Sequence, residues 1–201
     1  MPRYFNKFPK LFYKKPPYSA VVTDLLVRVD TVKEMLDNTA LFYQYDIQEG
    51  DTPEIIASKY YDDPELHWVV LMFNDMYDPY YDWPMDYLQF EKYITDKYGS
   101  IANAKTTVDH YEKIVETTDS FSNETTKRVY IIDLDSYNSL VPETVTRTFQ
   151  NGTSVTTKIS KRAVDKYDYE DELNESKRKI KLVRNDLIPE IKKQFESLMS
   201  E

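Results

Sequence analysis

The chain has 201 residues, 30% of them charged and 41% hydrophobic, and a formal net charge of −9. This composition is typical of one or two small globular domains, and the acidic balance disfavours general binding to nucleic acid or anionic membranes. The absence of cysteine and the presence of only three glycines exclude disulfides, cysteine-based zinc sites and Gly-rich phosphate-binding loops. The absence of cysteine fits a protein that folds in a reducing cytoplasm. No signal peptide or membrane-length segment is evident.

Residues 1–19 combine basic and aromatic side chains, and four prolines prevent a long helix there. We interpret this segment as an extended arm that either docks on another protein or straps across the surface of its own chain; a nucleic-acid arm is a weaker third interpretation. The aromatic residues that would make the contact are Tyr4, Phe5, Phe8, Phe12 and Tyr13. From Val22 to Leu36, apolar residues recur at helical spacing, which predicts a helix after the arm.

The next segment carries strand and helix signals in close succession. Tyr43–Ile47 alternates as a strand does, and Gly50 then allows a sharp exit. Thr52-Pro53-Glu54 has the cap, the proline and the acid of a helix start, and Asp63-Pro64-Glu65 repeats that pattern. After a loop rich in proline and tyrosine, another helix is expected from about Pro84 to a stop at Gly99.

Residues 106–160 are rich in threonine and valine and predict two hairpins. The first pairs residues 107–117 with 127–134 around a polar turn near Ser120–Thr126. The second spans residues 144–160, where Asn151-Gly152 between alternating runs is a strong turn signal.

The last segment, Val164 to Met199, predicts a return to helix, interrupted at Pro189. A narrow apolar stripe on this charged segment would pack against one partner, in this chain or another. Its members are Leu173, Ile180, Val183 and Leu187.

Catalytic and metal-binding signals are weak. The two histidines, His67 and His110, do not form a helical pair, so we expect ordinary hydrogen-bonded imidazoles and not a zinc site. A group of acids lacks the spacing and the central glycine of an EF-hand and is expected to serve loops and helix caps: Asp75, Asp78, Asp82 and Asp86. Sequence alone does not exclude a glycosidase pair of carboxylates, but helix starts and surface positions account for the acids. We therefore expect no enzyme, no cofactor and no metal.

One stretch resembles a LysM module, a unit of two helices and two strands of which many members bind N-acetylglucosamine polymers. The residues that stand in the order and spacing of that module are Tyr45, Ile47, Gly50, Asp51, Thr52, Ile55, Ala57, Tyr60, Leu66 and Asn74. The chain departs from the module in two places. A bulky loop, Met76–Trp83, stands where a short loop and the second strand usually follow, and Tyr61-Asp62 stands where Tyr-Gly is expected.

The continuation, Tyr60 to Pro84, resembles the LysM-like core of the baseplate wedge protein of T-even-type contractile-tailed phages. Thr23-Asp24-Leu25 is similar to an element that precedes the module in that family. The family's N-D-x-x-D-P-Y-Y-x-W run is matched by Asn74, Asp75, Asp78, Pro79, Tyr80, Tyr81 and Trp83. The later stretches "KYGSIANAK", "HYEK" and "ELNESKRKIKL" resemble the versions of marine and cyanobacterial myophages.

This resemblance implies an α+β fold and a structural role in the virion. The expected segments are an arm and helix (1–42), a LysM-like βααβ domain (43–99), a β-hairpin region (100–163) and a C-terminal helical segment (164–201). The protein would join neighbouring wedges of the tail baseplate around the hub, contacting large wedge subunits and the region where the sheath begins. It would be assembled in the host cytoplasm.

Two alternatives to the wedge role stay open at this point. The chain could be a peptidoglycan-binding LysM module that holds a machine or hydrolase at the cell wall, with a groove near Gly50–Thr52 and Asn74–Tyr77. A peptidoglycan hydrolase is a third and weaker interpretation. Under the wedge interpretation, binding energy is expected to concentrate in aromatic anchors. The alternative is that the two tryptophans are core residues, and for Trp68 the two interpretations are even. The candidates are Trp68, Tyr77, Tyr80, Tyr81 and Trp83.

Overall fold

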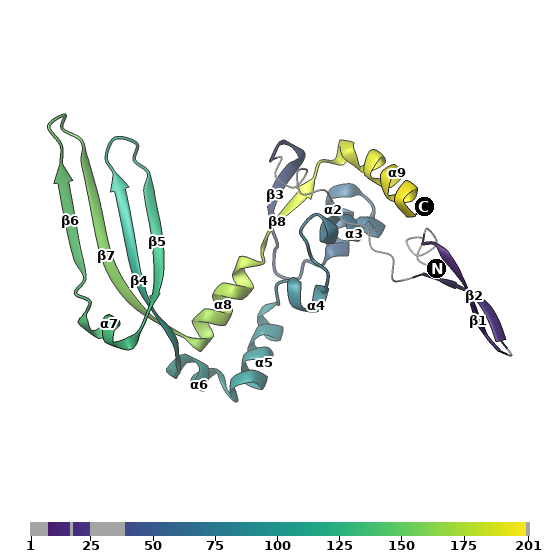
Figure 1. Ribbon diagram of the computed structural model, residues 1–201, viewed down its shortest axis with the longest axis horizontal. Helices are drawn as coiled ribbons and strands as arrows, with labels where there is room; N and C mark the ends of the chain where they lie inside the picture. Colours follow the sequence, from purple (N-terminus) through teal and green to yellow (C-terminus); the bar gives the residue numbers. More distant parts are fainter. Residues whose placement is uncertain (1–7, 17, 25–38, 200–201) are drawn as a thin grey trace. The chain divides into compact units, whose positions relative to one another are not determined.

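The computed structural model describes residues 8–16, 18–24 and 39–199 (Figure 1). It mixes helices and strands, as the predicted α+β class requires. The chain forms two compact units, and each is described by itself. Unit 1 contains the described residues up to Asp86 together with those from Glu175 onward, and unit 2 is Tyr87–Asn174. The division into four segments that the sequence suggested remains a prediction.

Unit 1 begins with an antiparallel hairpin of β1 (Lys10–Lys15) and β2 (Tyr18–Thr23). The backbone N–H of Asp24 donates to the carbonyl of Pro9 at its open end, at 2.9 Å. The arm is therefore folded back on itself in this region. The helix predicted from Val22 is wrong at Val22 and Thr23, because both residues pair with β1, and Asp24 is not helical either. The rest of that prediction, residues 25–36, lies outside the described residues, as do Tyr4 and Phe5 of the arm.

The body of unit 1 contains two short strands and several short helices. Thr52 Oγ1 accepts a hydrogen bond from the N–H of Ile55 at 3.3 Å, and Asp63 Oδ1 accepts one from the N–H of Glu65 at 3.0 Å. Both predicted helix starts are confirmed, and the second opens with a 3₁₀ turn. The elements are η2 (Thr39–Leu41), β3 (Phe42–Asp46), α2 (Pro53–Tyr61), η3 (Pro64–Leu66), α3 (His67–Met72), α4 (Pro79–Asp82), β8 (Lys179–Val183), η4 (Asn185–Leu187) and α9 (Ile188–Met199).

Strand β8 corrects the prediction for the C-terminal segment. It pairs antiparallel with β3, with Tyr45 opposite Ile180, and the two strands lie side by side in Figure 1. Residues 179–182 alternate as a strand does, since Ile180 and Leu182 are buried in the core while Lys179 and Lys181 are exposed. The expected helix over 164–199 is therefore wrong at β8 and also at Val164 and Asp165, which end the strand Ser154–Asp165, although helix forms on either side of β8. Pro189 does not interrupt a helix but lies in the first turn of a helix, Ile188–Met199.

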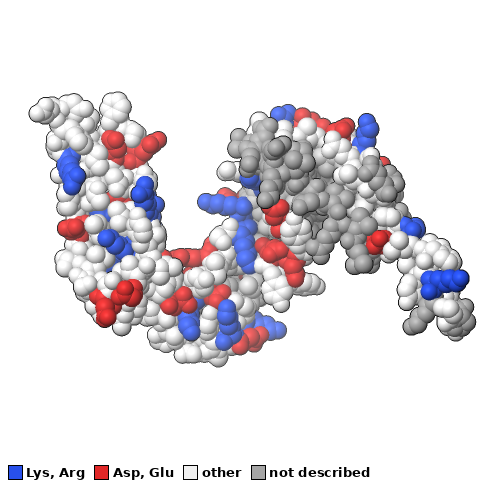
Figure 2. All heavy atoms as spheres, viewed as in Figure 1, with Lys and Arg blue, Asp and Glu red and all other residues white. Residues whose placement is uncertain are grey.

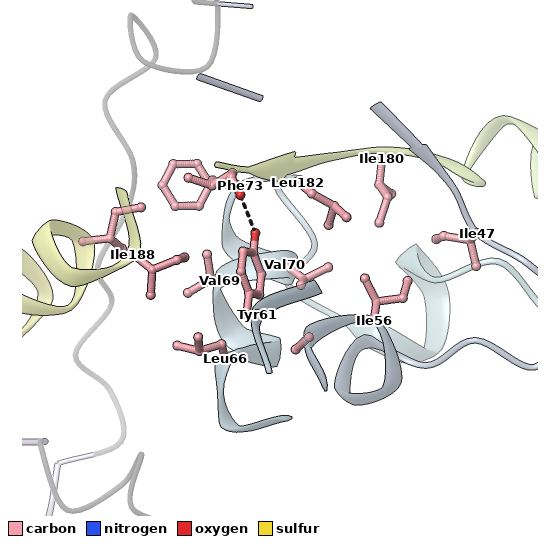
Figure 3. Packing of buried hydrophobic residues seen from close by; sticks show 13 residues of the cluster. Ile47, Ile56, Tyr61, Leu66, Val69, Val70, Phe73, Ile180, Leu182 and Ile188 are labelled. Carbon is pink, nitrogen blue, oxygen red and sulfur yellow. Dashed lines mark hydrogen bonds between the residues drawn. The ribbon is translucent and has the colours of Figure 1, made fainter. Parts of the chain in front are cut away.

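The core of unit 1 forms between the β3–β8 pair, α2, α3 and the start of α9 (Figure 3). Ile56, Val69 and Leu182 are almost completely buried. Burying one such side chain stabilises the fold by about 1.5–3 kcal/mol. The hydroxyl of Tyr61 donates to the carbonyl of Val183 at 3.1 Å, the dashed line in Figure 3, and so satisfies a polar group inside this core.

Unit 2 is a four-stranded antiparallel sheet with short helices at one end. The strand order is β5-β4-β7-β6, and both predicted hairpins are confirmed. Gly152, with φ of 84°, lies in the turn of the second hairpin, and Gly99, with φ of 82°, ends the predicted helix. The elements are α5 (Tyr87–Tyr98), α6 (Ile101–Thr106), β4 (Val108–Asp119), β5 (Thr125–Ile132), α7 (Leu134–Ser139), β6 (Glu143–Thr148), β7 (Ser154–Asp165) and α8 (Lys166–Ser176).

A buried carboxylate connects α8 to α5. Glu170 accepts hydrogen bonds from Lys97 Nζ at 2.6 Å, from the hydroxyl of Tyr98 at 2.7 Å and from that of Tyr93 at 3.0 Å. Burial raises the pKa of Glu170, but the three donors lower it by more, so that its pKa lies below its ordinary value of 4.5. The charged form of Glu170 therefore stabilises the packing of the two helices.

Candidate protein-binding surfaces

Both histidines have ordinary hydrogen-bond partners, as predicted. Nδ1 of His67 lies 3.1 Å from the carbonyl of Pro64. His110 lies between Asp109 and Glu112, and the hydrogen bond to Asp109 is the main cause of its raised pKa. Over the ranges that the structure describes, no group of three or more histidine, aspartate or glutamate side chains is arranged to hold a metal ion. Within the same ranges, no helix is both long enough and apolar enough to cross a membrane.

Asp51 organises the turn between β3 and α2. It is buried and accepts hydrogen bonds from the hydroxyl of Tyr45 at 2.7 Å, from Lys59 Nζ at 2.5 Å and from the N–H of Gln48 at 3.1 Å. Burial raises the pKa of Asp51, but these donors lower it by more, and burial together with the bond to Asp51 raises the pKa of Tyr45 to about 12. The residues from Tyr45 to Thr52 thus form a turn that is closed by its own side chains.

Asn74 connects the end of α3 to β8. Its amide nitrogen donates to the carbonyls of Val70 and Lys181, and its amide oxygen accepts from the N–H of Lys181, each at 2.8 Å. The side chain therefore pairs with the strand much as a neighbouring strand would. Among the other LysM-motif residues, Ile47, Ala57 and Leu66 are buried, whereas Ile55 is exposed.

The loop Met76–Trp83 is held by its own aspartates. Asp78 Oδ1 accepts from the N–H of Tyr80 at 3.0 Å, and Asp82 Oδ2 accepts from the N–H groups of Tyr77 and Asp78, each at 2.9 Å. These contacts confirm the expected capping role of the two acids. The tyrosines of this ordered loop nevertheless point into solvent, with exposed fractions of 66% for Tyr77, 90% for Tyr80 and 75% for Tyr81.

The two tryptophans pack within unit 1. Nε1 of Trp83 donates to the carbonyl of Asp51 at 3.0 Å, and the ring packs against the core. The ring centroid of Trp68 lies 4.5 Å from that of Phe195, in a small cluster that also contains Phe8. Of the candidate anchors, the structure therefore places Trp68 and Trp83 partly inside the unit and leaves the three loop tyrosines outside.

The structure supports the strap interpretation for one part of the arm and the docking interpretation for another. Phe8 is buried against the chain's own Phe195 and Met199, as a strap would be. Phe12 and Tyr13 are exposed on the hairpin, as a docking segment would be. Figure 2 shows lysine side chains and no acidic ones over the hairpin strands.

Sequence reasoning missed the exposure of the sheet in unit 2. Ile131 of β5 is 75% exposed, and Phe121, Val141 and Phe149, in the turns and loops that connect the strands, are also mainly in solvent. The signal was present in the strands, because threonines and charged residues occur on both alternating sets of positions, as in "TTKRVYII" of β5. A strand with polar residues on both faces does not present a continuous apolar face that could be buried in a core.

The comparison with protein families decides the assignment. A family model described as base plate wedge protein 53 matches residues 14–198, which is most of the chain. The chain belongs to the base plate wedge protein 53 family. Baseplate wedge protein gp53 of Enterobacteria phage T4 is 51% identical to it over 39 residues, which are 19% of this chain and 20% of that protein. The matched segment thus spans about a fifth of the T4 relative's length.

Membership of the base plate wedge protein 53 family gives the chain a structural role. It is a component of the phage tail baseplate and so of the virion, which confirms the prediction at that level. The family is a structural one, in agreement with the expectation that the chain is not an enzyme. The exposed aromatic residues of unit 1 and the exposed apolar residues of unit 2 are the candidate protein-binding surfaces.

Proposed function

We propose that the chain joins neighbouring baseplate wedges around the hub, through protein contacts made by both units. The observation that carries the proposal is that each folded unit keeps large apolar side chains in solvent. Tyr80 of unit 1 is 90% exposed and Ile131 of unit 2 is 75% exposed. Groups of such residues on a folded protein are typical of interaction surfaces. A chain with one surface on each unit can bind two partners at once, as a joining protein must.

The surface of unit 1 has the chemistry of a binding anchor. Tyrosine is enriched among the residues that dominate protein interfaces, and the loop of Tyr77, Tyr80 and Tyr81 is already ordered by its aspartates, which lowers the entropy cost of binding. The β1–β2 hairpin is marginal as an isolated two-stranded unit and exposes Phe12 and Tyr13, so a partner would stabilise it. The proposed partners are large wedge subunits and the region where the sheath begins.

A LysM-like scaffold is part of the proposal. β3, α2, α3 and β8 follow the strand-helix-helix-strand order of such a module, and the two strands pair antiparallel. In this chain the second strand comes only after unit 2, so unit 2 would be an insertion between the second helix and the last strand. The marine or cyanobacterial phage type is likewise a proposal that rests on sequence resemblance.

The glycan-binding alternative has less support from the geometry. The sugar groove would need free polar groups near Gly50–Thr52 and Asn74–Tyr77. The amide of Asn74 instead bonds to the backbone of Val70 and Lys181, and Trp83 bonds to the carbonyl of Asp51. The Gly50–Thr52 part of the expected groove is thus in contact with Trp83 of the chain's own loop. Both contacts favour protein binding by a module that has lost its sugar site.

The test is reconstitution of wedges from the other wedge proteins of the same phage. Wedge complexes purified without this chain are mixed with it, and mass photometry counts single and joined wedges. We expect joined wedges with the wild-type chain and with Leu88→Ala, which removes an exposed apolar side chain outside the proposed surfaces. We expect single wedges with the double variant Tyr80→Ala and Tyr81→Ala. Wedges that join equally well without the chain would contradict the proposal.

A further inference from the structure

The four-stranded sheet of unit 2 has two faces of different chemistry, and strand register assigns each residue to one of them. Val115 of β4 lies opposite Arg128 of β5 and Ile159 of β7. Alternate residues of a strand share a face, so Lys113 lies on the same side. We call this side the cationic face and define it by Lys113, Val115, Arg128, Val145, Arg147 and Ile159; the last three follow from the β6–β7 register.

Three cations of this face have no acidic partner in the part of the chain that the structure describes. Lys113, Arg128 and Arg147 form no ion pair among the described residues. The face also carries Lys161 and the two acids Asp119 and Glu143, so its four cations outnumber its acids in a chain whose net charge is −9.

The opposite face of the sheet differs in this respect. There Lys158 pairs with Glu116 at 3.8 Å, and Arg162 pairs with Glu172 at 2.6 Å and with Asp168 at 3.2 Å. Its cations are largely neutralised by acids within unit 2. The unpaired charges of the cationic face are therefore available to an external partner.

The cationic face is also incompletely covered. Tyr137 of α7 packs on one end, with its ring centroid 4.6 Å from that of Tyr111, and accepts a hydrogen bond from Lys161 at its carbonyl. Beyond that end, Val115 and Ile159 are half-buried and Val145 is 43% exposed. A sheet normally buries the apolar side chains of at least one face against another layer. Within the described residues of unit 2, no such layer covers the centre of the cationic face.

We propose that the cationic face binds an acidic surface of another baseplate protein. The inference rests on the proposed joining function, for which it supplies the second surface. Branched aliphatic residues at the centre with unpaired cations around them match a protein partner that has an apolar centre and an acidic rim. A second copy docking through the same face would bring like charges together, and duplex DNA would gain nothing from Val115, Val145 and Ile159.

The test compares two charge reversals of equal size on unit 2. The test variant is Arg128→Glu with Arg147→Glu, and the control is Lys92→Glu with Lys127→Glu, two exposed cations outside the cationic face. Binding of the full chain to wedge complexes is measured by biolayer interferometry at several salt concentrations. We expect the test variant to bind about tenfold more weakly or worse at 0.15 M salt, with a flatter salt dependence, and the control to bind like wild type.

The outcomes separate this inference from the proposed function. If the wild-type chain joins wedges and the test variant binds like the control, the cationic face is not the surface used, and the joining function stands. If the wild-type chain binds no wedge complex, the joining function itself fails. A dimer of the free chain in sedimentation velocity, or binding to a duplex DNA fragment, that is lost only in the test variant would identify a different occupant and overturn the inference.

Discussion

The buried carboxylate of Glu170 offers a sharp test of how unit 2 is held together. The substitution Glu170→Gln keeps the side-chain volume but removes the charge, and its amide NH₂ faces the donors Lys97, Tyr93 and Tyr98. A hydrogen bond to a charged group contributes about 1.5–3 kcal/mol. The side chain of Lys97 is 45% exposed and regains water when the bond is lost, so we expect a net cost of about 2–4 kcal/mol for the cluster.

The assay is hydrogen exchange read by mass spectrometry, because it reports on α5 and α8 separately from unit 1. A loss of about 2–4 kcal/mol corresponds to exchange about 30-fold to several hundred-fold faster in peptides from these helices. Asp96→Asn, an exposed acid on α5, is the control and should change stability by no more than about 0.5 kcal/mol. Equal exchange rates in Glu170→Gln and Asp96→Asn would refute the role assigned to Glu170.

The same cluster predicts a dependence on pH. The pKa of Glu170 is lower in the folded protein than its ordinary value of 4.5, so its contribution is fully present above that value and is lost as the pH falls through the folded pKa. Protection of α5 and α8 in the wild-type protein should therefore decrease on acidification below about pH 4.5. In Glu170→Gln this decrease should be smaller, since the titrating group is gone.

Three further variants test other parts of the account. Asn74→Ala removes the side-chain pairing with Lys181 and should destabilise unit 1 by about 1–3 kcal/mol, seen as faster exchange in β8; unchanged exchange there would contradict it. Tyr80→Ala with Tyr81→Ala should leave the melting temperature within about 2 °C of wild type while wedge binding is lost, whereas a large drop in melting temperature would make the loop tyrosines core residues. Gly152→Ala should cost about 1 kcal/mol, measured as faster exchange across β6 and β7, because φ at this turn is +84°; no change would mean that the turn tolerates a side chain.

Local chemistry in the sequence predicted the elements whose stabilising contacts are also local. The cap at Thr52 bonds to a residue three positions away, and the turn at Asn151-Gly152 joins strands that are adjacent in the chain. Such signals depend on a few neighbouring residues and not on the rest of the fold. The helix stop at Gly99 was predictable for the same reason.

The elements that depend on distant partners were not predictable in this way. β8 forms because β3 offers it a strand edge, yet Tyr45 and Ile180 are far apart in the chain, and the flanking residues are helical. The bond from Asn74 to Lys181 crosses a similar distance. Among the candidate site residues, composition favoured tyrosine at an interface, but only the fold separates the exposed Tyr80 from Trp83, which bonds to Asp51.

The most direct test of the joining function is photo-crosslinking between isotopically distinct wedges. A photo-reactive amino acid is placed at Tyr80 of unit 1 and at Arg128 of unit 2 in the same chain, which is then assembled with an equal mixture of ¹⁴N- and ¹⁵N-labelled wedge complexes. The account predicts single molecules of the chain that are crosslinked to a wedge protein of each label. Crosslinks from both positions that always lead to one and the same wedge would contradict it.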